Sequence, residues 1–149
     1  MKIGLLFSGQ GAQTVGMGKD LAAADTYTAE LFARANEILG YDLASIAFDG
    51  PQEELTRTAV AQPALYVHGY ACWQALKRRV PALDFVAAAG LSLGEFTAHA
   101  VAGTFTFEDG LRLVQRRAEA MQTVMEVADE NKTAEEIIKL SLKKLAGRI

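Results

Sequence analysis

The feature that most constrains the fold of this chain is a Gly-x-Ser-x-Gly motif at residues 90–94, which directly follows a short apolar run. This order predicts a nucleophile elbow, in which a strand ends, the chain turns sharply and a helix begins. Gly90 and Gly94 flank the turn because a side chain at either position would crowd the crossing of strand and helix. The turn exposes the Ser92 hydroxyl and leaves the backbone N–H of Leu93 at a helix N-terminus, where it can stabilise an oxyanion.

A second apolar run, residues 3–7, predicts another strand, buried on both faces of a parallel sheet. It ends at the loop of residues 8–13, where glycines on both sides of Gln10 let the backbone turn tightly and present its N–H groups. The loop lacks the P-loop lysine and the dinucleotide-binding spacing, so we do not expect a phosphate loop. Taken singly, this loop and the elbow motif are also compatible with plain strand–helix connections that have no catalytic role.

Capping signals and periodic apolar residues predict helices in the rest of the chain. Asp25 can cap an amphipathic helix that ends at Gly40. Pro63 suits the first turn of a longer helix over about residues 64–77, which places Gln62 at the mouth of that helix.

Arg117 lies on a helix that Thr106 is expected to cap, at the margin of the apolar stripe of that helix. One interpretation is that the side chain follows apolar surface and reaches water. The other is that the guanidinium is held for a carboxylate ligand, because its planar fork matches a carboxylate through two hydrogen bonds. The spacing alone favours the first interpretation.

The composition is that of an ordinary soluble globular protein: 149 residues, 50% of them hydrophobic and 22% charged. The net charge of −3 gives no reason to expect nucleic acid or an anionic membrane as a partner. Cys72 is the only cysteine, so an intrachain disulfide is excluded. No apolar stretch reaches transmembrane length and the N-terminus shows no signal-peptide pattern, so we expect a cytoplasmic protein.

Four motifs together resemble those of the malonyl-CoA:acyl-carrier-protein transacylases, a family that includes the acyltransferase domains of polyketide and fatty acid synthases. They are, in this order, Phe7-Ser8-Gly9-Gln10-Gly11-Ala12-Gln13, Ala61-Gln62-Pro63-Ala64, Gly90-Leu91-Ser92-Leu93-Gly94-Glu95 and Arg117 near Met121-Gln122. The resemblance covers about residues 1–122, a partial α/β domain, and leaves residues 123–149 as a helical tail outside it. It implies a three-layer, α/β-hydrolase-like subdomain with a short parallel sheet.

The resemblance also implies a reaction in two transfers and a role for each matching residue. Ser92 would attack the thioester of malonyl-CoA and then pass the malonyl group to the phosphopantetheine thiol of acyl carrier protein. The backbone N–H groups of Gln10 and Leu93 would form the oxyanion hole. Arg117 would pair with the malonyl carboxylate, which reverses the preference from spacing alone, and Gln62 would support the pocket. No cofactor and no metal are implied.

The chain departs from the family pattern in two places. Leu91 precedes the serine where the family commonly has histidine, which changes a wall of the pocket. Family members also continue with a small ferredoxin-like subdomain and a later histidine that activates the serine. The only histidines here are His68 and His99, and we expect neither to act as the base. A general base contributes roughly 10²–10⁴ in rate, so its absence puts activity in doubt.

The tail predicts a further helix, preceded by a polar turn over residues 129–132. Thr133 and Glu136 form a capping box, an apolar face follows, and Gly147 is a natural stop. This helix could cover apolar surface or form a contact between two copies of the chain. The open edge of a shortened sheet likewise predicts self-association.

Three hypotheses about function therefore remain open. The first is a malonyl transferase, active as it stands or completed by another chain. The second is a catalytically impaired truncated or engineered fragment that binds acyl-CoA or carrier protein, or self-associates. The third is a serine hydrolase with an unrecognised base, because esterases share the elbow.

Overall fold

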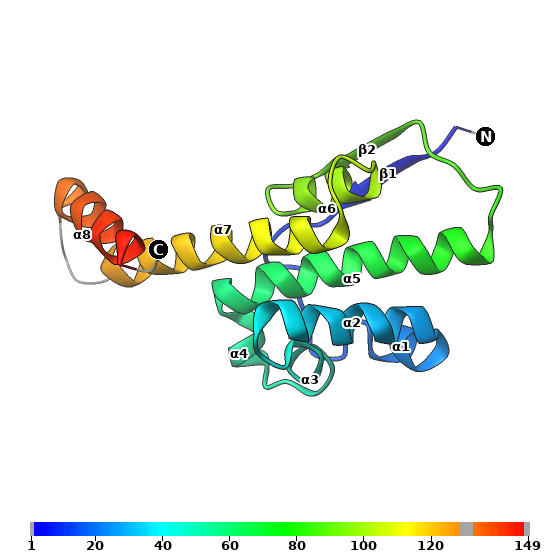
Figure 1. The fold of residues 1–149 in the computed structure, drawn as a ribbon, viewed down its shortest axis with the longest axis horizontal. Coiled ribbons are helices and arrows are strands. Elements are labelled where there is room, and N and C mark those ends of the chain that lie inside the picture. The colour runs from blue at the N-terminus through cyan, green and yellow to red at the C-terminus, as the bar shows by residue number, and fades with distance from the viewer. Residues whose placement is uncertain (1, 129–132, 148–149) are drawn as a thin grey trace.

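The sheet consists of two parallel strands, and helices pack against it (Figure 1). The structure, a computed structural model, describes residues 2–128 and 133–147. Strand β1 (Gly4–Phe7) pairs with strand β2 (Ala87–Gly90) in parallel, in a register that sets Gly4 beside Ala87 and Phe7 beside Gly90. Both strands predicted around the loop and the elbow are therefore confirmed, as is the α/β class with a short parallel sheet.

Helices make up most of the described chain, and the long helices α5 and α7 run side by side through it (Figure 1). No helix among residues 2–128 and 133–147 is long and apolar enough to cross a membrane. The helices are α1 (Lys19–Ala24), α2 (Thr26–Leu39), α3 (Leu43–Asp49), α4 (Gln52–Thr56), α5 (Thr58–Arg79), α6 (Gly94–Val101), α7 (Phe107–Ala128) and α8 (Ala134–Ala146).

Two of the capping predictions are confirmed by side-chain hydrogen bonds. Asp25 accepts from the backbone N–H of Thr28 at the start of α2, and Thr106 accepts from the N–H of Asp109 at the start of α7. The Thr28 hydroxyl and the Arg78 guanidinium hold the pKa of Asp25 below its usual value. Gly40 ends α2 in the left-handed conformation, as predicted.

The predicted start of α5 is wrong, because this helix begins at Thr58 and continues through Pro63. Proline has no N–H to donate to the carbonyl four residues earlier, and this usually interrupts a helix. Here that carbonyl, of Ala59, accepts a 3.3 Å hydrogen bond from the Tyr41 hydroxyl instead. A tertiary contact therefore satisfies the freed carbonyl, and Gln62 lies inside the helix rather than at its mouth.

The main core lies between α2, α3, α4, α5 and α7. Tyr66 is fully buried there; its ring stacks on Phe107 and its hydroxyl donates to the Phe107 carbonyl at 3.0 Å. Burial raises the pKa of Tyr66 well above its ordinary value, so the phenol stays neutral. The largest other side chains with almost no exposed surface are Leu31, Phe32, Leu43, Leu55, Leu93 and Leu111.

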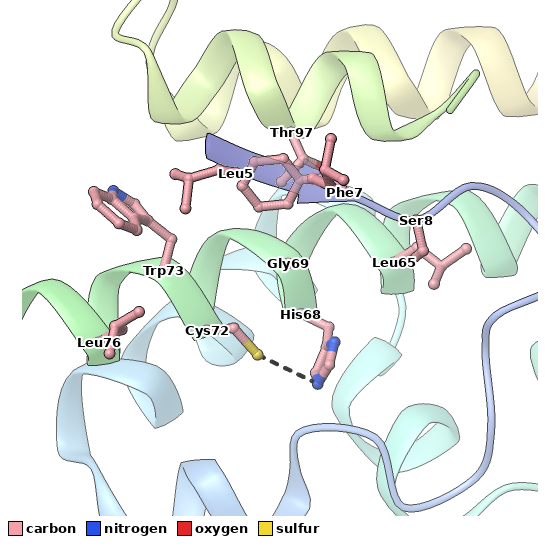
Figure 2. A pocket seen from close by; sticks show the side chains of 11 residues that line it. Leu5, Phe7, Ser8, Leu65, His68, Gly69, Cys72, Trp73, Leu76 and Thr97 are labelled. Carbon is pink, nitrogen blue, oxygen red and sulfur yellow. Dashed lines mark hydrogen bonds between the residues drawn. The ribbon is translucent and has the colours of Figure 1, made fainter. Parts of the chain in front are cut away.

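Helices α5 and α6 cover one face of the sheet, where Phe7 lies beside Thr97 of α6 (Figure 2). The alternate residues on the two strands, Gly4, Leu6, Ala87 and Ala89, are exposed, and Leu6 is 86% exposed. The prediction that β1 is buried on both faces is therefore wrong, because among the described residues helices cover only one face of the sheet. Two of the three predicted layers are thus formed by the described residues.

The predicted tail helix is confirmed as α8, and its capping box has the expected form. Thr133 Oγ1 accepts from the Glu136 N–H, and a Glu136 carboxylate oxygen accepts from the Thr133 N–H. The helix packs on α7, at the end of the molecule away from the sheet (Figure 1). Ile138 and Leu142 on its apolar face are 60% and 62% exposed. The turn predicted at residues 129–132 lies outside the described residues.

Candidate active site

The elbow has the backbone geometry that its sequence predicts. Ser92 has a φ of +55°, a conformation that residues other than glycine rarely adopt. A Cβ atom added to Gly90 would lie 1.9 Å from the backbone carbon of Gly94, and one added to Gly94 would lie 2.3 Å from the Phe7 carbonyl oxygen. Only glycine fits at either position, because the strand and the helix cross at backbone contact.

The serine lies at the start of α6, next to the end of β1. The Leu91 N–H donates to the Phe7 carbonyl at 3.1 Å, so strand pairing extends as far as the residue before the nucleophile. Leu93 precedes the first residue of α6 and its side chain is buried. Leu91 is 73% exposed, and its proposed place in a pocket wall stays a prediction.

Arg117 points toward the serine. Its Nη2 donates to Ser92 Oγ at 2.8 Å and its Nη1 donates to Gln62 Oε1 at 2.5 Å, while the guanidinium carbon lies 5.8 Å from the centre of the Phe96 ring. Residues from α5, α6 and α7 thus meet at one point. The interpretation that spacing alone favours, in which the Arg117 side chain reaches water, therefore does not describe this position.

Gln62 and Gln10 extend this group of hydrogen bonds away from the serine. Gln62 has no exposed surface; its Nε2 donates to Gln10 Oε1 at 3.2 Å and to Met121 Sδ at 3.3 Å. Gln10 Nε2 in turn donates to Thr58 Oγ1 at 3.0 Å. Thr58 belongs to none of the sequence motifs, although its position one helical turn before Gln62 places both on one face of α5.

Neither histidine is paired with the serine in the described structure. His99, on α6, is exposed and bonds Thr104 Oγ1 at 3.2 Å. His68 lies on α5, 3.6 Å from the Cys72 sulfur. The Ser92 hydroxyl instead accepts a hydrogen bond from Arg117. In this arrangement neither histidine can act as the general base for Ser92.

His68 and Cys72 line a separate cavity of about 280 Å³ between β1 and α5 (Figure 2). Burial lowers the pKa of His68 and raises the pKa of Cys72, so both groups are neutral near pH 7. A neutral thiol is a weak nucleophile, and the cavity is otherwise mostly apolar. In the part of the chain that the structure describes, no three His, Cys, Asp or Glu side chains are grouped as metal ligands.

The comparison with known families identifies one domain along most of the chain. Residues 5–145 match the acyl transferase domain family. The match extends past the domain boundary predicted at residue 122, and that boundary stays a prediction.

Curated relatives point to the same enzymes. The human mitochondrial malonyl-CoA-acyl carrier protein transacylase is 47% identical over 124 residues, which are 82% of this chain and 32% of the relative. The Haemophilus influenzae malonyl CoA-acyl carrier protein transacylase is 42% identical over 121 residues, 81% of this chain and 39% of the relative. The matched part of the chain thus spans 32% and 39% of the lengths of these two relatives.

Solved structures agree with the sequence relatives. An acyl carrier protein S-malonyltransferase from Vibrio cholerae superposes with a TM-score of 0.78 at 39% identity, over 83% of this chain and 40% of that one. A type II polyketide acyl-carrier protein in complex with its malonyl-transacylase gives the same TM-score at 38% identity, with the same shares covered.

Proposed function

The chain belongs to the acyl transferase domain family, and from this premise we propose that it carries the acyl-accepting half of a malonyl-CoA:acyl carrier protein transacylase site. The observation that carries the proposal is the Arg117 guanidinium, bonded to both Ser92 Oγ and the buried Gln62. A cation held beside a nucleophile suits an acyl group that brings its own carboxylate.

In the proposed first transfer, Ser92 Oγ attacks the thioester carbonyl of malonyl-CoA. A C–O bond forms, the C–S bond breaks, and the thiol of CoA leaves with the proton that the serine gives up. When malonyl-CoA binds, Arg117 exchanges its hydrogen bond to Ser92 Oγ for bonds to the malonyl carboxylate, which frees the serine oxygen to attack. The backbone N–H groups of Gln10 and Leu93 hold the carbonyl oxygen while it is an oxyanion.

In the proposed second transfer, the phosphopantetheine thiol of acyl carrier protein attacks the malonyl ester on Ser92. A C–S bond forms, the C–O bond breaks, and the serine takes the proton that the thiol gives up. Arg117 stays on the malonyl carboxylate through both transfers, while Gln62 keeps the guanidinium in place. The leucine at position 91 forms an apolar wall of the pocket mouth.

A second candidate function is a fragment that binds acyl-CoA or carrier protein without turnover. The partners of His68 and His99 favour it, because they leave Ser92 without a histidine base among the described residues. A base from another chain would convert this candidate into the first one.

Intact-protein mass spectrometry after mixing with malonyl-CoA tests the first candidate. We expect a malonyl adduct on the chain and none on Ser92→Ala. Arg117→Ala should lower malonyl loading about tenfold more than acetyl loading, because a lost hydrogen bond to a charged group is worth about 1.5–3 kcal/mol. A folded chain without any adduct would favour the binding fragment, and equal losses for both acyl groups would remove the carboxylate role of Arg117.

A further inference from the structure

A continuous chain of side-chain hydrogen bonds connects Thr58 to the guanidinium beside the serine. Thr58 is the first residue of α5 and is 3% exposed. Its Oγ1 accepts from Gln10 Nε2, Gln10 Oε1 accepts from Gln62 Nε2, and Gln62 Oε1 accepts from Arg117 Nη1. The hydrogen bonds all point the same way, because each glutamine accepts one at its Oε1 and donates one from its Nε2.

The direction of such a chain matters because an amide can be turned over. Turning Gln62 would bring its N–H₂ group against the guanidinium of Arg117, two donors facing each other beside a positive charge. Turning Gln10 would bring its own N–H₂ group against that of Gln62. The amide of Gln62 can therefore keep its orientation only if the amide of Gln10 also keeps its own.

Two methionines of α7, both partly exposed, favour the same direction. Thr58 Oγ1 donates its single proton to Met125 Sδ at 3.5 Å, and Gln62 Nε2 donates to Met121 Sδ at 3.3 Å. A thioether sulfur accepts hydrogen bonds and has no proton to donate. Thr58 therefore presents only lone pairs to Gln10, which must turn its N–H₂ toward the threonine.

We propose that Thr58 is a positioning residue, and that with Met121 and Met125 it sets the orientation of the Arg117 guanidinium and thereby the preference for acyl groups that carry a carboxylate. The part of this inference that concerns acyl preference rests on the proposed function. The positioning of Arg117 does not, because it follows from the hydrogen bonds of the resting chain.

The first test follows the Arg117 side chain itself by nitrogen-15 NMR, with the signal assigned through Arg117→Lys. Thr58→Val keeps the shape of the side chain and removes the hydroxyl. It should speed the rotation that exchanges the two Nη groups by about fivefold, as expected for one hydrogen bond. Thr58→Ser restores the hydroxyl and should rotate at the original rate.

The matched control is Thr56→Val, which removes a hydroxyl from an exposed threonine on α4 that bonds only within its own turn. It should leave the rotation unchanged. Equal rotation in folded Thr58→Val and in the unchanged chain would overturn the proposal. If Thr58→Val does not fold, Met125→Leu takes its place: faster rotation supports the proposal and unchanged rotation overturns it.

The second test compares malonyl and acetyl loading of Ser92 by intact mass. Thr58→Val should lower the ratio of malonyl to acetyl adduct about fivefold, and Thr58→Ser and Thr56→Val should preserve it. No adduct at all on the unchanged chain would count against the proposed function only. The rotation measurement would then still decide whether Thr58 positions Arg117.

Discussion

The helical part of the molecule and its sheet differ in how completely they are packed. Between the helices, Tyr66 and Leu111 are fully buried, and the Tyr66 hydroxyl has a partner. On the sheet, Leu6 is 86% exposed and Val86, just before β2, is 69% exposed. A two-stranded sheet rarely persists by itself, so β1 and β2 depend on the helices along their covered face.

The candidate site lies across the boundary between these two regions. Gln62 and Arg117 come from α5 and α7, which pack against each other, although Met121 and Met125 of α7 are 38% and 52% exposed. Ser92 and Gln10 come from the ends of the two strands. The binding half of the site is therefore held by helices that share the core, whereas the nucleophile half depends on a sheet with an uncovered face.

The largest expected effect is a difference in the free energy of unfolding between a variant of the helical core and a variant of the open sheet face. Leu111→Ala should lower the free energy of unfolding by about 2–5 kcal/mol, because it leaves a cavity in the core. Leu6→Ala, a deletion of the same atoms on the open face, should change it by less than about 0.5 kcal/mol. Urea unfolding of both variants measures the difference, and equal losses would show that Leu6 is covered in solution.

An intermediate effect concerns self-association through the sheet. We expect a solution mass above that of one chain, and Leu6→Lys should weaken the association about tenfold by placing a charge in an apolar contact. Leu142→Lys places the same charge on the exposed face of α8 and distinguishes the tail from the sheet. Sedimentation equilibrium measures both, and a single-chain mass for the unchanged protein would contradict the expectation.

The smallest expected effect is a pH dependence that comes from His68 of α5, one of the residues that line the cavity beside β1 (Figure 2). Burial lowers the pKa of His68 in the folded chain, against an opposing effect of the Asp20 carboxylate, so the unfolded chain takes up its proton first as the pH falls. The contribution of neutral His68 to the free energy of unfolding is complete above the pKa of the unfolded chain, about 6.5. It is lost as the pH falls from there through the pKa of His68 in the folded chain.

Urea unfolding at about pH 7.5 and about pH 5.5 measures this loss. His68→Gln should show a smaller loss than the unchanged chain. His99→Gln removes an exposed imidazole and should keep the loss as it was. Identical pH dependence in His68→Gln and the unchanged chain would show that His68 is hydrated in the folded state.

Local sequence rules predicted the features that depend on a few neighbouring residues. Asp25, Thr106 and Thr133 cap helices as expected, since a cap needs only a side chain and an N–H two or three residues away. The start of α5 could not be predicted this way, because the partner of the Ala59 carbonyl is Tyr41, eighteen residues earlier. The short helices α1 and α3 carry too few apolar repeats to be recognised.

By itself, the sequence determined the elbow, because backbone contact between strand and helix excludes any side chain at Gly90 and Gly94. It did not determine where Arg117 points, since a long side chain at the margin of an apolar stripe can reach water or turn inward. Only the packing of α7 against α5 decided this. That packing brings Gln62 Oε1 to 2.5 Å from the guanidinium and leaves a buried amide that needs a donor.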